Sequence, residues 1–275
     1  FVTDRWGVPD SIRAALKQLH SNTKAPLVGA VFVGDIPIPM IRDAQYMTSA
    51  FKMDQKAYPR KDSSVPSDRF YDDFSLDFDY LGCDDDGDPY FYYSLTAKSA
   101  QRLHPDLFTG RIRPTDAGGT SRYDKLRRYL LKAVAEKQSQ NRLDHIFYFT
   151  GSGSLSESAV AHQDERVTYY DHIPALRRAP EALNFMDYGD RTYIKTHMMN
   201  QLMQPEMDLA ILHHHGNWDT QYLSKPPKWM HKDSVDKAML DLTLPDFQAF
   251  GFQPDCRVGI FHACYNASFH RQDCI

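Results

Sequence analysis

Three consecutive histidines close an apolar run in the second half of the chain, and a single cysteine closes a similar run near its end. The histidines, 213–215, follow the run 208–212, and Cys264 follows the run 257–262. Short continuous apolar runs are typical of buried strands, and parallel strands present the side chains at their carboxyl ends along one edge of a sheet. A thiol and an imidazole that meet at such an edge would form a nucleophile with its base.

We predict that His215 and Cys264 are this pair. An imidazole beside a thiol lowers the pKa of the thiol and can protonate the amine that leaves a cleaved peptide bond. The two residues lie 264 − 215 = 49 positions apart, which is enough chain for crossovers between neighbouring parallel strands. The N–H groups of Gly216 and Cys264 are predicted to bind the oxyanion. A structural cysteine and a core histidine are the alternative, but both residues follow apolar runs, which favours the pair.

The other two histidines allow a different site. Side chains alternate along a strand, so His213 and His215 face one side and His214 faces the other. All three could bind one metal ion only where the chain bends. A metal-dependent hydrolase that uses the cluster 213–215 therefore remains an alternative function.

An acidic turn is a second candidate metal site. Asp84, Asp86 and Asp88 alternate along the chain, and their oxygens could bind a structural calcium ion. The stretch is not an EF-hand loop, because Pro89 stands where that loop requires glycine and no glutamate closes it. A solvated acidic hairpin without a metal is the alternative.

Composition limits the class of protein. The chain has 275 residues, of which 42% are hydrophobic and 25% charged, so it can bury a core as one large domain or two subdomains. A net charge of −4 and a pI near 6.3 argue against nucleic acid as a partner. No apolar run approaches the roughly 18 residues that span a bilayer, so membrane insertion is not expected. Four cysteines without a C-x-x-C pair indicate at least one free thiol.

Hydrophobic periodicity predicts strands that alternate with helices. In the first half, strands are expected at 27–33, 69–71, 90–93 and 108–112, helices from Pro9 and at 121–138, and a long surface loop at 52–67. In the second half, strands are expected at 145–150, 183–188, 208–215 and 257–264, and helices around Glu157 and at 192–203 and 234–242. This alternation predicts an α/β fold with a layered, mostly parallel sheet. The glycine turn 151–154 lacks the lysine of a phosphate-binding loop, so nucleotide binding is not expected.

The two strand ends also resemble a known family. His214–Trp218 together with Phe261–Asn266 resembles the active-site pair of the gingipain-type cysteine peptidases, which belong to the same clan as the caspases. Caspase-like enzymes have a His-Gly at the end of one strand and an Ala-Cys at the end of a later one, at about this separation. The stretches 33–37, 66–71 and 110–112 resemble landmarks of the family's amino-terminal subdomain, and Glu157-Ser158 with His162 resembles one of its loops.

The resemblance implies a caspase-like layered sandwich with a mostly parallel sheet, residues 141–275, preceded by a smaller α/β subdomain, residues 1–140. It also implies a cysteine endopeptidase that acts on a protein or peptide substrate and needs no cofactor for its chemistry. Cys264 would be the nucleophile, His215 the general base and acid, and Glu157 a third member that orients the imidazole. An acid at a helix start is alternatively a favourable capping charge.

The sequence departs from the family in its specificity pocket. Arginine-specific gingipains place an aspartate about eleven residues after the loop glutamate, and Thr168 stands there in this chain. A hydroxyl does not compensate for the desolvation of a guanidinium as a carboxylate does, so strong arginine specificity is not expected unless Asp164, Glu165 or Asp171 substitutes. Trp218 is a candidate wall of the substrate cleft, with a core aromatic as the alternative.

Two further expectations come from the family. Its members continue well past the nucleophile, whereas 275 − 264 = 11 residues follow Cys264, so part of the pocket is expected beyond Ile275. They are commonly exported by bacteria, which implies a secreted, cell-surface or periplasmic protein. A non-catalytic peptidase-like binding or scaffold domain, with the same strands and a blocked pocket, remains an alternative.

Overall fold

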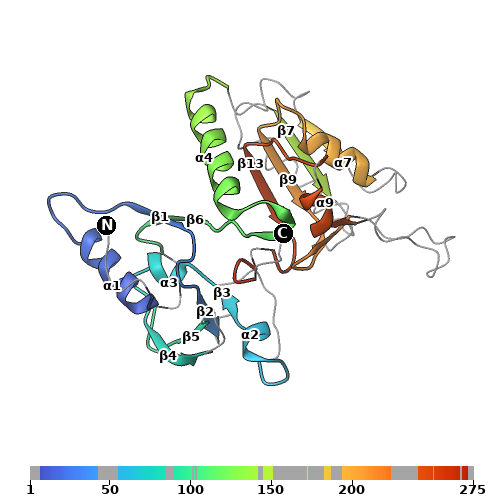
Figure 1. The fold of residues 1–275 in the computed structure, drawn as a ribbon. Coiled ribbons are helices and arrows are strands. Elements are labelled where there is room, and N and C mark those ends of the chain that lie inside the picture. The colour runs from blue at the N-terminus through green and yellow to red at the C-terminus, as the bar shows by residue number, and fades with distance from the viewer. Residues whose placement is uncertain are drawn as a thin grey trace. The chain divides into compact units, whose positions relative to one another are not determined.

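The chain divides into two units in the computed structural model, unit 1 at Phe1–Pro114 and unit 2 at Thr115–Ile275 (Figure 1). The structure describes residues 7–42, 55–84, 90–100, 102, 104–141, 145–150, 172, 183–186, 194–223, 241–249, 251–266 and 268–271. Both units combine helices with sheets, so the predicted α/β class is confirmed.

Unit 1 has a four-stranded mixed sheet and a separate parallel pair of strands. Its helices are α1 (Pro9–His20), α2 (Arg60–Ser63) and α3 (Arg69–Asp72). Its strands are β1 (Gly29–Val33), β2 (Pro39–Arg42), β3 (Val65–Pro66), β4 (Phe78–Cys83), β5 (Phe91–Leu95) and β6 (Phe108–Ile112). The larger sheet has the order β3-β2-β5-β4, and β1 pairs with β6.

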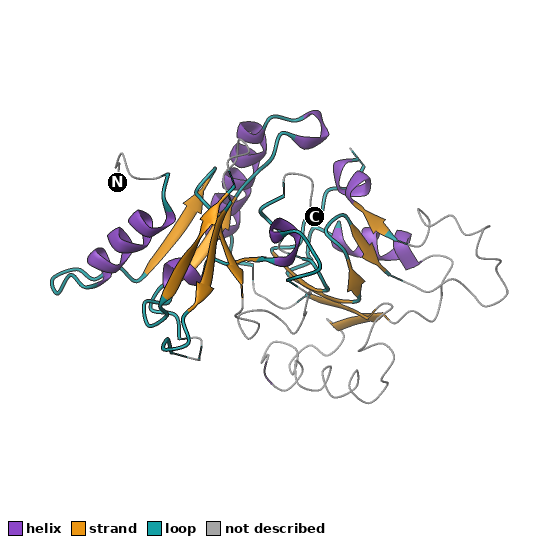
Figure 2. Cartoon of the chain, turned by 90° about the horizontal axis from the view of Figure 1, so that it is seen from below, coloured by secondary structure: helices purple, strands orange, loops and turns teal. Residues whose placement is uncertain are grey.

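The core of unit 1 lies between α1 and the strands, which Figure 2 shows side by side. Ile12 and Leu16 recur at helical spacing and are buried there with aromatic residues of α3 and β5. Pro9 occupies the first turn of α1, where its missing N–H costs no hydrogen bond. The hydroxyl of Tyr93 donates to the Asp10 carboxylate and so links β5 to the same helix.

Three predictions for unit 1 are wrong in detail. Residues 69–71 form helix α3, because the N–H groups of Phe70 and Tyr71 turn back to the carbonyls of Ser67 and Asp68. These consecutive aromatic residues are both buried, at 1% and 0% exposure, and consecutive burial does not distinguish a strand from a helix. The partner of β5 beside the acidic turn is β4 instead.

The other two corrections concern the stretches 52–67 and 27–33. The first is not a continuous loop, since α2 and β3 lie within its described part. The second forms β1, but Val31 is 65% exposed and Val33 45%, so the strand is not buried throughout as expected. β1 belongs to a two-stranded sheet, and the described residues leave one of its faces exposed.

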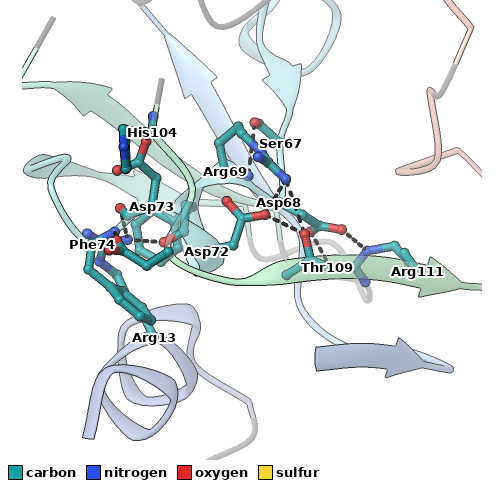
Figure 3. A network of polar contacts seen from close by, with 12 residues as sticks. Arg13, Ser67, Asp68, Arg69, Asp72, Asp73, Phe74, His104, Thr109 and Arg111 are labelled. Atoms are coloured by element: carbon teal, nitrogen blue, oxygen red, sulfur yellow. Dashed lines mark hydrogen bonds and ion pairs between the residues drawn. The ribbon is translucent and has the colours of Figure 1, made fainter. Parts of the chain in front are cut away.

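A buried arginine side chain connects three separate stretches of unit 1; Figure 3 shows its contact with Asp68. Arg111 on β6 donates two hydrogen bonds to the Asp68 carboxylate, at 2.9 and 2.7 Å. It also donates to the carbonyls of Ile36 and Pro37, at 2.8 and 3.3 Å. The two-bond geometry fits the planar guanidinium, and side-chain exposures of 6% and 15% remove the pair from water.

A buried carboxyl group lies beside this arginine network. The side chains of Arg69 and Thr109 donate to Asp72 (Figure 3). Burial raises the pKa of Asp72 to about 6, although its contacts with Thr109 and Arg69 act in the opposite direction. Because the folded state then binds a proton more readily than the unfolded state, Asp72 contributes less stability as the pH rises from about 4 to about 6.

Unit 2 is built on a four-stranded parallel sheet with the order β13-β9-β7-β8. Its strands are β7 (Ile146–Thr150), β8 (Leu183–Met186), β9 (Leu209–His213), β10 (His215–Gly216), β11 (Thr220–Tyr222), β12 (Leu242–Thr243) and β13 (Val258–His262). Its helical elements are η2 (Ala117–Gly119), α4 (Arg122–Gln138), α7 (Ile194–Leu202) and α9 (Leu244–Gln248). The strands predicted near 146, 183 and 258 and the helices predicted at 121–138 and 192–203 are confirmed.

Two predicted helices of this unit lie mostly or wholly outside the described residues. They are the helix around Glu157 and the helix at 234–242, of which only the last two residues are described. Leu242 lies in β12.

The sheet of unit 2 is stabilised by packing on one face and by hydrogen bonds at the amino-terminal ends of its strands. Phe147, Phe149, Ala210 and Leu212 pack with residues of α7 and α9 in the core of the unit. At these amino-terminal ends the buried carboxylate of Asp208 accepts hydrogen bonds from the His145 N–H and from the side chains of Asn141 and Arg257. Its bonds connect the segments that lead into β7, β9 and β13, so these strands start in register.

Helix α4 belongs to unit 2, so the division at Pro114 precedes the boundary that the sequence suggested near residue 140. Ser121 caps the helix by accepting the Asp124 N–H. Ion pairs of 2.8 Å, Lys132–Asp255 and Glu136–Arg257, link α4 to the segment that leads into β13. The predicted apolar stripe of α4 is largely exposed in the described structure. None of the described helices has the length and apolar character required to span a bilayer.

The Arg111–Asp68 pair predicts a large effect of a small substitution. Asp68→Asn would leave the buried guanidinium without its counter-charge, and we expect the free energy of unfolding of unit 1 to fall by about 3 kcal/mol. The matched control is Asp35→Asn, which removes a 3.8 Å ion pair of a 56% exposed carboxylate. That control should cost less than about 1 kcal/mol. Equal effects in denaturant titrations would contradict this account of the pair.

Candidate active site

The predicted adjacency of the two strands is confirmed. β9 and β13 pair in parallel over five register positions, from Leu209 opposite Val258 to His213 opposite His262. Their carboxyl ends therefore lie at the same edge of the sheet. The His214 N–H extends the contact by donating to the His262 carbonyl at 3.4 Å.

The strand that was expected to end in His215 ends two residues earlier, at His213. The chain bends at His214, and His215 and Gly216 form β10, which pairs antiparallel with β11. Hydrogen bonds between Asn217 and Thr220 close a tight turn in this hairpin. His215 thus leaves the edge of the parallel sheet on a separate strand, which periodicity within an apolar run does not reveal.

Gly216 brings this hairpin into contact with the segment that carries the cysteine. A Cβ atom built on Gly216 would lie 2.8 Å from the Ala263 Cβ and 2.8 Å from the Cys264 carbonyl oxygen. Both distances are too short for any side chain, so the backbones approach as closely as glycine allows. The residues after His215 and before Cys264 are therefore side by side.

The direction of the Gly216 N–H follows from the pairing of the hairpin. Asn217 and Thr220 form a hydrogen-bonded pair of the β10–β11 ladder. Gly216 and Gln221, one step further along, are therefore a non-hydrogen-bonded pair. The N–H of Gly216 therefore points away from β11 and is not used in the pairing with that strand.

Cys264 stands in a strained turn directly after β13. Tyr265, the next residue, has φ = 56°, a left-handed conformation that a bulky side chain rarely adopts. The Asn266 side chain stabilises the turn by donating to the Phe261 carbonyl at 3.1 Å. It also accepts a 3.0 Å hydrogen bond from Gln221 on β11, a residue with no exposed surface. The turn and the His215 hairpin are thus joined through side chains as well.

The two members of the predicted pair are accessible, unlike the two histidines that directly precede His215. His215 and Cys264 are both exposed, whereas His213 and His214 are buried. His213 lies beside Tyr148 and His214 beside Phe149, so the two imidazoles face opposite sides, as alternation predicts. Of the three consecutive histidines, His215 is therefore the one that a substrate in solution can reach. His262, two residues before Cys264, is exposed as well.

His214 has a structural role. Its Nδ1 is 3.0 Å from the His215 carbonyl oxygen, so the N–H donates there and fixes the tautomer. Burial lowers the pKa of His214 to about 4, and this hydrogen bond opposes the change. The imidazole is neutral near pH 7 and supports the backbone from which the His215 side chain extends.

The three described cysteines differ in their surroundings. Cys264 and Cys83 are free and exposed, and Cys256 is half-buried. Burial raises the pKa of the Cys256 thiol, the effect of Lys132 being in the opposite direction. Cys264 has a histidine-bearing strand next to it, which makes it the described thiol best placed for chemistry.

Trp218 lies in the turn between β10 and β11 and is half-buried. The guanidinium of Arg271, from the segment after Cys264, lies 5.1 Å from the centre of its ring, a cation–π distance. This contact again joins the histidine segment to the cysteine segment.

Several other predicted site residues lie outside the described residues, namely Glu157, Thr168, Asp86 and Asp88. Asp84 is described, and its carboxylate accepts a hydrogen bond from the Tyr92 hydroxyl. Within the described residues no group of three or more His, Cys, Asp or Glu side chains is arranged to hold a metal ion.

Three residues of the site were missed from the sequence: His262, Gln221 and Asn266. Gln221 and Asn266 fix the cysteine turn, and His262 has its Nδ1 2.7 Å from that of His213. A signal for His262 was present, because it precedes Cys264 by two residues as His213 precedes His215. Gln221 carries no such signal, since its role depends on the hairpin that follows the bend at His214.

Comparison of the chain with protein-family models, with curated protein sequences and with solved structures finds no match.

The close approach at Gly216 predicts the effect of adding one methyl group. Gly216→Ala should push the Ala263–Cys264 segment away and lower stability by about 1–3 kcal/mol, since the added Cβ meets backbone. Alkylation of Cys264 should slow at the same time. Gly251→Ala is the matched control, because nothing lies within 4 Å of its added Cβ. A Gly216→Ala protein with the stability and thiol reactivity of the control would contradict the contact.

The buried imidazole predicts acid sensitivity. Because the pKa of His214 is near 4 in the folded state and about 6.5 when unfolded, the unfolded state binds more protons at mildly acidic pH. The contribution of His214 is present above pH 6.5 and decreases as the pH falls toward 4. His214→Asn keeps an N–H donor and removes the titration. Between pH 7 and 5 the parent should lose about 2 kcal/mol more than this variant in urea titrations; parallel losses would refute the assignment.

Proposed function

We propose that the chain is a cysteine peptidase in which Cys264 and His215 form a catalytic dyad. The observation that carries the proposal is the contact of Gly216 with Ala263 and Cys264, because it places the residue after the histidine against the cysteine turn. The exposure of both dyad members supports it, since a substrate must reach them. The caspase-like layered sandwich is part of the same proposal, supported by the parallel sheet β13-β9-β7-β8.

The reaction follows from the roles of these groups. His215 takes the proton of Cys264, and the thiolate attacks the carbonyl carbon of the peptide bond. The oxyanion accepts hydrogen bonds from the N–H groups of Gly216 and Cys264. The tetrahedral intermediate collapses to a thioester as His215 protonates the leaving amine. Water, deprotonated by His215, then hydrolyses the thioester, which releases the acid and restores the thiol.

Other parts of the proposal come from the sequence resemblance. Glu157 would orient the His215 imidazole, Thr168 would line the pocket for the residue before the cleaved bond, and Trp218 would form a wall of the cleft. A pocket with a hydroxyl at that position favours an uncharged residue over arginine, because it offers no counter-charge. Action outside the bacterial cytoplasm is proposed on the same basis. No cofactor is needed for this chemistry.

The first test compares the three described thiols, those of Cys83, Cys256 and Cys264, in one protein. Cys264 should react with a peptide-based thiol electrophile at least about tenfold faster than Cys83 at neutral pH, because the imidazole increases its thiolate fraction. Cys83 is the internal control, since it is also exposed. Mass spectrometry of the labelled peptides measures all three rates. Equal rates at Cys264 and Cys83 would contradict the dyad and favour a non-catalytic binding domain.

The second test uses a peptide library. The parent protein should cleave members of the library, and Cys264→Ala should abolish cleavage, whereas Cys83→Ala should retain it. Digestion is followed with and without a chelator and with added calcium. Cleavage that survives Cys264→Ala but stops with the chelator would reject the dyad in favour of a metal-dependent hydrolase.

A further inference from the structure

Two histidines outside the proposed dyad form a direct contact at the carboxyl ends of β9 and β13. His213 and His262 are opposite each other in the register, and their Nδ1 atoms are 2.7 Å apart. Their ring centres are 4.5 Å apart and the planes meet at 73°. One Nδ1 must donate a proton to the other, since two bare nitrogens or two N–H groups would repel each other. The contact is therefore a hydrogen bond between side chains.

The position of this bond relates it to the dyad. His213 precedes His215 by two residues, and His262 precedes Cys264 by two residues. His213 is only 3% exposed and packs beside the Tyr148 ring of β7, with ring centres 5.6 Å apart. Its imidazole is therefore a fixed point within the sheet. The hydrogen bond connects the His213 imidazole to His262, the last residue of β13, which is the strand that precedes Cys264.

The hydrogen bond adds to the contacts that hold β13 at this end, among them the one between Asn266 and the Phe261 carbonyl. β13 is the terminal strand of its sheet, so within the described residues its one neighbouring strand is β9. Beyond the register pairs, the backbone contributes the 3.4 Å bond from the His214 N–H to the His262 carbonyl, which is long. Cys264 follows His262 by two residues, and the strained residue Tyr265 comes directly after Cys264. Movement of the strand end would move the Cys264 sulfur relative to His215.

We propose that the hydrogen bond between His213 and His262 positions Cys264 against His215, which makes His262 a positioning residue for activation of the thiol. This inference rests on the proposed dyad and adds the part that aligns it. A displacement of about 1 Å between reacting groups can lower a rate by about 100-fold, so one hydrogen bond is sufficient for such a role.

The test separates the hydrogen bond from the packing of the ring. His262→Asn replaces the ring but keeps an amide near the position of Nδ1, so it can still bond His213. His262→Phe keeps a ring of similar shape and removes the nitrogen. Val258→Ala is the control, because Val258 is exposed on the same face of β13 and lies at the opposite end of the strand. The alkylation rate of Cys264 by iodoacetamide is measured over a pH series, beside that of Cys83.

We expect His262→Phe to slow alkylation of Cys264 at neutral pH by about tenfold or more and to shift the pH dependence toward that of an ordinary thiol. His262→Asn and Val258→Ala should retain the parent rate and profile. A Phe variant as reactive as the parent, or an Asn variant as slow as the Phe variant, would overturn the inference. If Cys264 in the parent reacts no faster than Cys83, the dyad itself fails, which is a different result.

Discussion

The parallel pairing of β9 with β13 is the constraint on which the candidate site depends. The two strands are separated by more than forty residues of chain, yet each position of one is fixed against a position of the other. Asp208 fixes the start of this pairing through bonds to the segments before β7 and β13. Since parallel strands end at one edge, aligned starts and equal lengths bring the histidine segment and the cysteine segment to the same place.

Two unusual backbone features occur where these segments meet. Gly216 has no Cβ, and the adjoining Ala263–Cys264 backbone occupies the space where one would lie. Tyr265 adopts a left-handed conformation in the residue directly after the cysteine. Each feature carries a conformational cost, and such costs are concentrated where a precise arrangement is needed. Both serve to hold an exposed sulfur beside a strand that carries an exposed imidazole.

Much of this arrangement could be predicted from the sequence, and particular residues show why the rest could not. Apolar runs located β7, β9 and β13, and the rule for parallel strands placed the histidine segment next to the cysteine segment. The residue predicted at the end of the strand was His215, whereas β9 ends at His213. The bend at His214 was missed because this residue is buried like the strand residues before it. The sequence therefore does not show where the strand stops. Phe70 and Tyr71 were assigned to a strand for the same reason, since their burial depends on the tertiary core and not on periodicity.

The boundary between the two units was harder to predict from the sequence than the helices and strands were. Helix α4 has an amphipathic pattern that identifies it as a helix, but the pattern does not say which unit it joins. Its membership of unit 2 depends on contacts over long sequence distances, among them the ion pairs of Lys132 and Glu136 with the segment before β13. The importance of His262 is also a tertiary property, because it appears only when its register partner on β9 is known.

The central claim is that the sulfur of Cys264 and the imidazole of His215 are neighbours in solution. The most direct measurement is reaction of the folded protein with 1,3-dibromoacetone, a short reagent that alkylates a thiol and then a second nucleophile within reach. The account predicts a covalent bridge between Cys264 and His215, identified by mass spectrometry of the digested product and lost on unfolding before the reaction. Alkylation of Cys264 without that bridge, or with a bridge to a different residue, would contradict it.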